Sequence, residues 1–438
     1  MQPKPGDHVE IKTKEAILKG TIIPQEGKTI VLKLPNGYNI GINPKDILKI
    51  TTIKSGKKPG TILVTNLKHN PNLPKITFIA TGGTIGTHVD YETGAVYMCR
   101  TPEQILTTTP ELGNIVNIKT ASPFTTASED MSPENWQALA TIIAKELNNG
   151  SQGIILTHGT DTLHFTSAAL SFMLPNLSKP VALVGAQRSP DRGSFDGTQN
   201  LLCAAHYAKS DIAEVAIVMH ATSNDDYCLA NRGTKVRKMH TSRRDAFRPI
   251  NALPLAKIWP DGKFEKTNPH YNIRSDNKIT ADTAFEKKVG ILKVFVGSDP
   301  KIIDWYIENK YRGLVIEGTA LGHVPTGESG TKAGYFDKKM SWIPYIKKAV
   351  DAGIVVVMAS TCLYGRINPF VYRNLRLANA TGMLYGDKLG TDMLPEVAYI
   401  KLGWVLGHTK NPEKAKEMML TNYAHEISER SYGNTFLY

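Results

Sequence analysis

Hydrophobic and polar residues follow two different patterns along this chain, and the change falls near residue 75. Upstream of it, apolar and polar residues alternate in short runs, which predicts half-buried β-strands. The runs lie at residues 9–12, 16–23, 30–34 and 38–42. Pro35-Asn36-Gly37 separates the last two runs, and an Asn-Gly pair favours a tight hairpin because both residues accept positive φ. Residues 1–53 are therefore predicted to form a small SH3-like β-barrel, and residues 54–74 a linker.

Downstream of residue 75 the apolar runs become continuous and alternate with helical segments. Val- and Ile-rich runs without alternation are typical of strands covered on both faces, as in a parallel sheet. Strands are predicted at residues 76–80, 153–157, 181–185, 214–219, 289–296, 313–317 and 353–359. Helices are predicted at residues 133–147, 162–174, 196–208, 301–310 and 342–352. This alternation indicates an α/β fold with largely parallel sheets.

Local signals refine these elements. Pro133 after Ser132 favours a helix start, and Asp196 is predicted to cap the helix that follows it. The irregular stretch 221–285 predicts a loop or hairpin excursion. The α/β part then divides into one domain over residues 75–280 and a second over residues 285–438, which ends in a polar, partly helical tail.

Charge is distributed unevenly. The 438 residues are 41% hydrophobic and 21% charged, which is ordinary for a globular protein. Of the net charge of +12, residues 1–75 carry +8, because they hold 13 Lys, no Arg and five acidic residues. Two interpretations stay open for this module: a lysine-rich solvated surface, or a surface that faces a polyanion.

Cysteine usage and hydropathy exclude several classes. The four cysteines lie far apart without metal-ligand spacing, which predicts reduced, mostly buried thiols and no structural metal; they are Cys99, Cys203, Cys228 and Cys362. No apolar run approaches the roughly 18–20 residues that a membrane span requires. The N-terminus has no apolar stretch of the signal-peptide type, so the cytoplasm is the expected location.

Two threonine-containing turns carry the candidate chemistry. Thr81-Gly82-Gly83-Thr84-Ile85-Gly86 follows the strand predicted at 76–80, and Thr157-His158-Gly159-Thr160-Asp161-Thr162 follows the one at 153–157. Parallel α/β sheets place ligand sites at the carboxyl ends of their strands. A hydroxyl beside free N–H groups provides a nucleophile and an oxyanion pocket. One glycine turn is common for structural reasons, but two in the same position indicate an acyl-transfer site.

The same turns resemble the two signature motifs of the asparaginase family of amidohydrolases. Further matches are Gly233-Thr234-Lys235-Val236-Arg237-Lys238, and Gly185-Ala186-Gln187-Arg188 followed by Asp196-Gly197. The similarity covers roughly residues 75–410 and implies a two-domain asparaginase-like fold. The N-terminal barrel and the extended tail are not features of plain asparaginases. They resemble the D-type subunits of archaeal glutamyl-tRNA(Gln) amidotransferases, which are built on an asparaginase-like core.

The resemblance implies roles for individual residues. Thr84 would attack the side-chain amide carbon, and Thr160, Asp161 and Lys238 would activate water or support that attack. A threonine hydroxyl is a poor nucleophile until a base removes its proton. A lysine with an ordinary pKa near 10.4 must be desolvated or crowded by like charge to act as that base. The cations expected to crowd Lys238 are Arg232, Lys235 and Arg237; the alternative is that Lys238 belongs to an ordinary basic surface loop.

Substrate contacts are implied in the same way. Ser128 and Glu129 match the segment that grips the substrate's amino and carboxyl ends, although they could instead cap the helix that starts at Pro133. Asp161 would contact the same ammonium group. His158 is expected to be a packed, hydrogen-bonded residue.

Two further loops match family features. The lid tyrosine of the family corresponds to Tyr91 or Tyr97, and the choice stays open. Residues 317–323 resemble the Gly-rich loop that reaches a neighbouring subunit's site. His323 replaces the asparagine usual there, which affects the expected amino-acid specificity.

The resemblance implies an amidohydrolase subunit of a tRNA-dependent amidotransferase. It would release ammonia from glutamine or asparagine for the conversion of Glu-tRNA(Gln) to Gln-tRNA(Gln). The sequence has no P-loop, so ATP and Mg²⁺ are expected in an E-type partner subunit and no cofactor in this chain. The other expected partners are tRNA(Gln), bound through the complex, and a second copy of this chain. The alternatives are a stand-alone L-asparaginase and a catalytically silent amino-acid sensor or RNA-binding scaffold.

Overall fold

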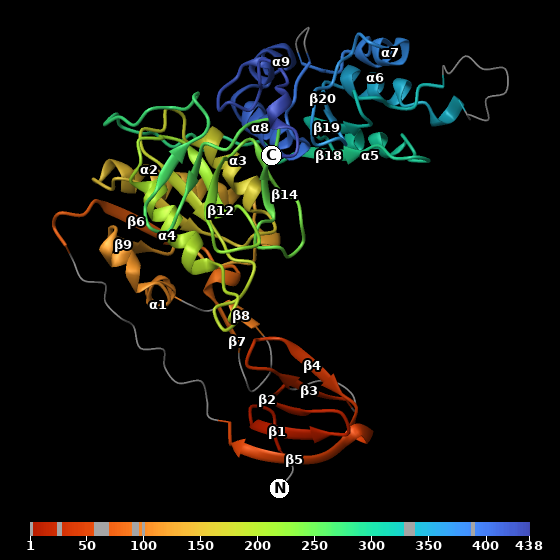
Figure 1. Cartoon of the computed structure of the whole chain (residues 1–438). Helices are drawn as coiled ribbons and strands as arrows, with labels where there is room; N and C mark the ends of the chain where they lie inside the picture. The colour runs from red at the N-terminus through yellow and green to blue at the C-terminus, as the bar shows by residue number, and fades with distance from the viewer. Residues whose placement is uncertain are drawn as a thin grey trace.

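Three sheets form the framework of the protein. The computed structural model describes residues 3–23, 29–56, 70–89, 96–98, 101–327, 338–386 and 390–438. Figure 1 shows a small N-terminal sheet at one end, a large central sheet with helices on both faces, and a smaller sheet in the C-terminal part. Both views place the hairpin of β7 (Thr87–Val89) and β8 (Val96–Met98) between the N-terminal sheet and the central domain.

The N-terminal sheet is antiparallel, with the strand order β4-β3-β2-β1-β5. Its strands are β1 (His8–Thr13), β2 (Ile17–Ile23), β3 (Ile30–Lys33), β4 (Asn39–Ile42) and β5 (Ile47–Lys54). The four predicted strands are present, and β5 is an addition. Apolar side chains from four strands form one small core: Val9, Ile11, Ile22, Leu32 and Ile42. No ladder joins β4 to β5 in the described chain, so hydrogen bonding leaves this sheet open.

The hairpin between β3 and β4 differs from the expected two-residue turn. The backbone N–H of Leu34 donates to the Tyr38 carbonyl at 2.8 Å, and these two residues close a loop over residues 35–37. Gly37 has a φ of 83°, whereas Asn36 is not among the described residues with positive φ. A three-residue loop of this kind needs a left-handed residue only at its last position.

The central sheet has eight strands in the order β17-β16-β13-β12-β11-β10-β6-β9. Five are parallel: β6 (Lys75–Ala80), β9 (Asn117–Ala121), β10 (Ile154–Thr157), β11 (Val181–Val184) and β12 (Val215–His220). Three antiparallel strands extend it: β13 (Cys228–Arg232), β16 (Ala256–Ile258) and β17 (Phe264–Lys266). The predicted excursion at 221–285 therefore contributes strands to the main sheet. It also holds a separate hairpin of β14 (Val236–Lys238) and β15 (Phe247–Pro249).

Helices cover this sheet: α1 (Pro102–Thr107), α2 (Pro133–Asn148), α3 (Leu163–Met173) and α4 (Gly197–Ala208). The predicted start of α2 is confirmed, because Pro133 follows Ser132, whose backbone N–H donates to the Asn135 side chain at 2.9 Å. Asp196 precedes α4 as predicted, but its side chain makes no capping hydrogen bond. It accepts instead from two backbone N–H groups earlier in the same loop, described below.

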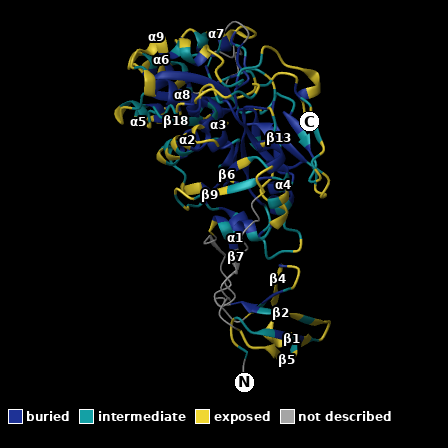
Figure 2. Ribbon diagram, turned by 90° about the vertical axis from the view of Figure 1, so that its left-hand side faces the viewer, coloured by how far each residue is buried: buried dark blue, intermediate teal, exposed yellow. Residues whose placement is uncertain are grey.

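The C-terminal sheet is parallel and contains β18 (Val289–Lys293), β19 (Gly313–Gly318) and β20 (Val355–Ser360). Its helices are α5 (Ile302–Glu308), α6 (Ile343–Asp351), α7 (Arg373–Asn379), α8 (Pro395–His408) and α9 (Pro412–Leu420). Figure 2 shows that the central strands and α8 are buried, whereas exposed residues gather on the outer helices and the N-terminal strands. Helix α8 packs against both α3 and β19, so it joins the two α/β units.

Two buried ion pairs hold the C-terminal part in place, one against the central domain and one within the C-terminal part itself. Lys235, on the connection between β13 and β14, contacts Asp392 at 2.7 Å. Lys401 of α8 contacts Glu426 of the tail at 2.5 Å, and neither side chain is exposed. The tail then returns to the central domain, where the Thr234 hydroxyl donates to the Ala424 carbonyl at 2.8 Å.

The N-terminal module contacts a loop of the central domain. Lys33 forms a 2.7 Å ion pair with Asp191, and both side chains are largely buried. The guanidinium of Arg192 lies 5.5 Å from the ring centre of Tyr38. This loop connects β11 to α4, next to the carboxyl edge of the central sheet.

Replacing Glu426 by alanine is expected to lower the free energy of unfolding by about 3–5 kcal/mol, because the buried Lys401 ammonium loses its counter-ion. Lys401 would keep only the carbonyls of Met419 and Thr421, at 2.7 and 2.6 Å. Guanidinium denaturation measures the change. The matched control is Glu413→Ala, which removes an exposed pair with Lys416 and is expected to cost less than about 1 kcal/mol. Equal effects of the two substitutions would contradict the importance of the buried pair.

Candidate active site

The two threonine-containing turns pack directly on each other. In the central sheet Thr157 of β10 lies opposite Ala80 of β6, so both strands end at the same level. The backbone N–H and hydroxyl of Thr81 donate to the Thr157 carbonyl at 3.2 and 2.8 Å. Gly83 has a φ of 86°, and a Cβ there would lie 2.5 Å from the backbone nitrogen of Gly159. Glycine is therefore required at position 83 for the turns to meet.

Lys238 reaches the second turn from the end of β14. Its ammonium donates to the Thr160 hydroxyl at 2.9 Å and to the Asp161 carboxylate at 2.6 Å. Thr160 is buried and Lys238 nearly so, whereas the Asp161 side chain is 66% exposed. The structure brings these three side chains into contact, and the Lys238 side chain is 9% exposed. Their catalytic role stays a prediction.

Thr84 lies in the adjacent turn, at the first position of the short 3-10 helix Thr84–Gly86. Its carbonyl accepts from the Thr87 hydroxyl at 2.7 Å. Among the described residues, no hydrogen bond joins the Thr84 hydroxyl to Thr160, Asp161 or Lys238. The fold thus assembles the hydroxyl–carboxylate–amine group completely and places the other threonine beside it.

The cations expected to crowd Lys238 are paired in the structure. Each neighbouring cation has its own carboxylate: Arg232 with Glu214 at 2.6 Å, Lys235 with Asp392 at 2.7 Å and Arg237 with Glu396 at 3.4 Å. Burial would raise the pKa of Asp392, but the adjacent Lys235 charge and hydrogen bonds from Lys235 and Ser428 lower it below its usual range. The carboxylates therefore offset the positive charge of the loop, and Lys238 differs from these cations in its contact with a hydroxyl.

Ser128 and Glu129 lie on a 3-10 turn, Ser128–Asp130, beside the second threonine turn. The Ser128 carbonyl accepts from the Thr162 hydroxyl at 2.6 Å. Helix α2 is capped by Ser132 and not by this pair, so the capping alternative is wrong. Their position next to Asp161 is compatible with substrate binding, and that role stays a prediction.

His158 is a packed residue, as expected. It is buried, with Nδ1 2.6 Å from the Gly159 carbonyl and Nε2 2.9 Å from the Thr166 hydroxyl. Thr166 also accepts from the Trp136 indole at 3.1 Å. Burial lowers the pKa of His158 to about 4, so the ring is neutral at neutral pH. The His158 imidazole therefore links the second threonine turn to α3 through Thr166.

The loop after β11 supports Thr160 from behind, and sequence reasoning missed this role. A Cβ at Gly185 would lie 2.8 Å from Cγ2 of Thr160, so the turn packs on bare backbone. The fully buried Asp196 accepts from the backbone N–H groups of Gln187 and Arg188 at 3.0 and 2.9 Å. The matching motif was visible in the sequence, but nothing in it indicated that Gly185 touches Thr160.

Other predicted features lie away from this group. Tyr91 is outside the described residues, and Tyr97 lies in β8, paired with His88 of β7, so the choice of lid tyrosine stays open. His323 follows β19, with its ring centre 5.2 Å from that of Tyr372. Cys203 and Cys228 are buried and Cys362 is exposed, all three as free thiols, while Cys99 is outside the described residues.

A cavity of ≈ 440 Å³ lies between the tail and the central domain, and its lining includes Arg232, Asn251, His270 and His425. Thr84, Thr160 and Lys238 do not line this cavity. Within the described part of the chain, no cluster of three or more His, Cys, Asp or Glu side chains is arranged to hold a metal ion.

No described helix combines the length and apolar character needed to cross a membrane.

Comparison with known proteins first defines the class. The model of the asparaginase N-terminal domain matches residues 75–271, and that of the glutaminase/asparaginase C-terminal domain matches residues 288–419. The thermostable L-asparaginase from Thermococcus kodakarensis has a TM-score of 0.69 at 26% identity, over 81% of this chain and 99% of that one. L-asparaginase I from Vibrio cholerae gives 0.67 at 25% identity, with the same coverage. The fold is that of the asparaginase-type amidohydrolases.

The N-terminal module then defines the family. The GatD N-terminal domain model matches residues 3–53. Proteins named as the D-type subunit of glutamyl-tRNA(Gln) amidotransferase are similar over nearly their full length. The one from Pyrococcus furiosus is 49% identical, over 99% of this chain and 97% of that protein. The one from Methanothermobacter thermautotrophicus is 43% identical, over 97% and 94%. The chain belongs to the family of D-type subunits of glutamyl-tRNA(Gln) amidotransferase.

Acid is expected to destabilise the fold through His158 and His164, because burial lowers their pKa values to about 4 and about 3 from an ordinary 6.5. The unfolded chain then binds more protons, so stability is lost as the pH falls below about 6.5. Between about pH 7 and pH 5, each histidine is expected to lower the free energy of unfolding by about 2 kcal/mol. Urea denaturation at both pH values measures this, and His158→Asn should flatten the dependence; an unchanged slope would contradict it.

Proposed function

We propose that this chain is the amide-hydrolysing subunit of a tRNA-dependent amidotransferase. It releases ammonia from glutamine or asparagine, and a partner uses that ammonia to convert Glu-tRNA(Gln) to Gln-tRNA(Gln). The observation that carries the proposal is the 2.9 Å contact between the Lys238 amine and the Thr160 hydroxyl. The chain that makes this contact resembles the D-type relatives, and the likeness includes the N-terminal module at residues 3–53. A stand-alone L-asparaginase would account for the core of the chain but not for that module.

In the proposed reaction Thr84 is the nucleophile. Its hydroxyl oxygen attacks the side-chain amide carbon, and backbone N–H groups of the Gly-rich turn 81–86 stabilise the oxyanion. The C–N bond breaks, ammonia leaves with the proton, and the acyl group stays on Thr84 until water hydrolyses the ester. Thr160 and Lys238 would pass on the proton that Thr84 or the attacking water releases. Asp161 would hold the Lys238 amine beside Thr160.

Carboxylates beside the turn are assigned to substrate recognition. Asp161 and Glu129 would face the substrate's ammonium group, for which a carboxylate is the matching partner. Ser128 would donate to the substrate's carboxylate. The support for this assignment is the packing of the 128–130 turn against the second threonine turn, through the 2.6 Å bond to Thr162.

Partners complete the proposed activity. ATP-dependent activation of the tRNA-bound glutamate, with Mg²⁺, is assigned to an E-type partner subunit, and tRNA(Gln) joins through the complex in the cytoplasm. A second copy of this chain is proposed to cover an exposed apolar patch beside His323, since such patches mark interaction sites. The patch consists of Phe295, Val296, Phe370, Val371 and Tyr372.

Removing the amine of Lys238 should abolish proton transfer at Thr160. We expect Lys238→Met to lower kcat for glutamine hydrolysis by on the order of 10³-fold, because the remaining members of a catalytic group cannot replace a missing one. The matched control is Lys266→Met. Lys266 lies on β17, away from the threonines, and donates to Asp211, so its replacement should leave kcat unchanged. Thr84→Val is expected to be equally damaging with the fold intact; a kcat near wild type in either variant would refute the assigned roles.

The coupled role is tested by measuring glutamine hydrolysis alone and with the partner subunit and charged tRNA. The proposal predicts that the partner and the tRNA stimulate hydrolysis and that amidation follows. Full activity in isolation without stimulation, together with a preference for free asparagine, would favour the stand-alone asparaginase instead.

A further inference from the structure

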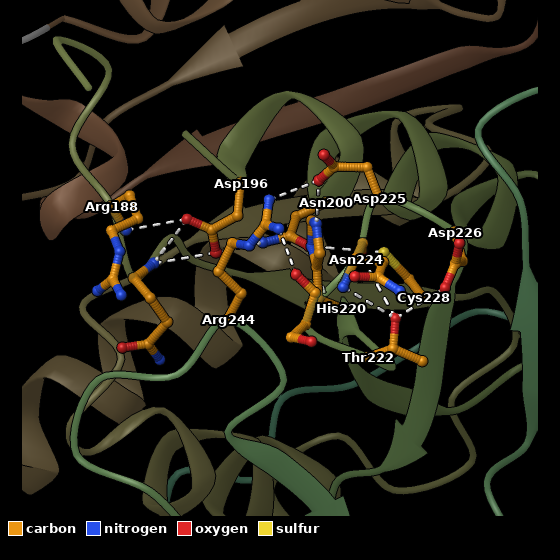
Figure 3. Close-up of polar contacts among 12 residues, drawn as sticks. Arg188, Asp196, Asn200, His220, Thr222, Asn224, Asp225, Asp226, Cys228 and Arg244 are labelled. Atoms are coloured by element: carbon orange, nitrogen blue, oxygen red, sulfur yellow. Dashed lines mark hydrogen bonds and ion pairs between the residues drawn. The ribbon is translucent and has the colours of Figure 1, made fainter. Parts of the chain in front are cut away.

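A chain of hydrogen bonds leads from the loop behind Thr160 to the protein surface (Figure 3). Its first member is Asn200, a buried residue of α4. The Asn200 amide nitrogen donates to the Gly185 carbonyl at 3.0 Å and to Asp196 at 3.2 Å. Its amide oxygen accepts from the backbone N–H of His220 at 3.1 Å. A carbonyl only accepts and a backbone N–H only donates, so these contacts fix the orientation of the amide.

His220, the fully buried last residue of β12, is the second member. Its Nδ1 lies 2.6 Å from the Asn200 amide oxygen, which is an acceptor, so Nδ1 carries a proton. Its Nε2 lies 3.1 Å from the Asp225 carboxylate. Burial lowers the pKa of His220, the carboxylates of Asp225 and Asp196 act in the opposite direction, and Arg244 adds to the lowering. The ring donates to Asp225 only when Nε2 carries a second proton.

Arg244 is the last member and lies on the loop that follows Lys238. Its guanidinium contacts Asp225 at 2.5 Å and also donates to the Ser223 carbonyl. This loop, residues 239–246, connects β14 to β15. Arg188, from the loop behind Thr160, donates to the Ser242 carbonyl of the same loop at 2.9 Å. The network therefore joins the loop that supports Thr160 to the loop that continues from Lys238.

We propose that His220 is a positioning residue for the amidase site, which holds the Gly185–Arg188 loop and the 239–246 loop in one arrangement. Through Asn200 it fixes the Gly185 backbone against which Thr160 packs. Through Asp225 and Arg244 it fixes the segment that follows Lys238. The 2.9 Å contact between the Lys238 amine and the Thr160 hydroxyl depends on both loops at once, and the proposal rests on the proposed function of that pair.

Buried histidines often serve packing alone, but the contacts of His220 point to more. Both ring nitrogens face polar groups, one on α4 and one on the loop between β12 and β13, and each of these groups contacts a loop of the site. If His220 served packing alone, an apolar side chain could fill the same space and would bring no polar group into the interior. Thr222 and Asp226, by contrast, bond each other at 2.9 Å in the same surface loop and stand outside the chain that leads to Gly185.

Substitutions at His220 and at Arg244 test the buried part and the surface end of the network separately. His220→Ala removes both contacts and is expected to lower kcat for glutamine hydrolysis by roughly 10- to 100-fold with little change in KM, because small displacements of catalytic groups cost this much. His220→Asn keeps a donor near the position of Nδ1 and should recover part of the loss. Arg244→Met breaks the network at its partly exposed end and should reproduce part of the loss without disturbing the core. Asp226→Asn is the matched control in the same loop and should keep the wild-type kcat.

The pH dependence of kcat provides a second test, because a purely structural role of His220 would not change it. The ring donates to Asp225 only when Nε2 is protonated, so the kcat deficit of Asp225→Ala relative to wild type should be larger below the pKa of His220 than above it. Folded His220→Ala and Arg244→Met proteins that both keep the wild-type kcat would overturn the proposal. If the wild-type complex itself hydrolyses neither glutamine nor asparagine, the proposed function fails instead. If His220→Ala does not fold, the Arg244→Met and Asp225→Ala results decide.

Discussion

The structure depends on one contact, in which the Lys238 amine lies within hydrogen-bond distance of the Thr160 hydroxyl and the Asp161 carboxylate. A nearly buried ammonium is costly unless polar groups compensate for the lost water. Here a hydroxyl and a half-solvated carboxylate do so, and both belong to one turn at the carboxyl end of β10. The surrounding structure must therefore hold a strand from a distant hairpin against that turn. Most unusual features of the fold serve this constraint.

Close backbone packing brings the elements together. Gly83 lets the first threonine turn touch the second, and Gly185 lets a third loop support Thr160 from behind. On the opposite side, the hairpin that carries Lys238 is anchored by the C-terminal part through the pairs Lys235–Asp392 and Arg237–Glu396. The position of the amine is thus set jointly by both α/β units. The contact of Lys33 with Asp191 places the N-terminal module on the loop that continues from Gly185. A change in any of these parts can reach the site through a few rigid contacts.

Much of this arrangement could be predicted from the sequence, and the exceptions have physical reasons. Most parallel strands are visible because continuous apolar runs bounded by turns are rare elsewhere, but the partly polar strand β9 was missed. Helix α8 escaped prediction because it is buried on nearly all sides, which removes the amphipathic period that marks a surface helix. Asp196 has the sequence position of a helix cap but bonds the Gln187–Arg188 backbone of its own loop instead, a contact that the capping pattern does not encode.

The candidate site shows the same division. Motif resemblance located Thr84, Thr160, Asp161 and Lys238, and the fold brings the last three into contact. Carboxylates supplied by distant segments offset the positive charge expected around Lys238, and no local pattern could indicate them. His220 was invisible as a site residue for a similar reason, because its two partners come from α4 and from a surface loop.

The most direct test of one shared centre is to locate the acyl group during turnover. Glutamine is mixed with the complete complex, the reaction is quenched within one turnover, and peptides are analysed by mass spectrometry. The account predicts a glutamyl ester on the peptide that contains Thr84, at a level that falls as substrate is exhausted. A glutamyl ester confined to the Thr160 peptide, or steady turnover with no acylated threonine, would contradict it.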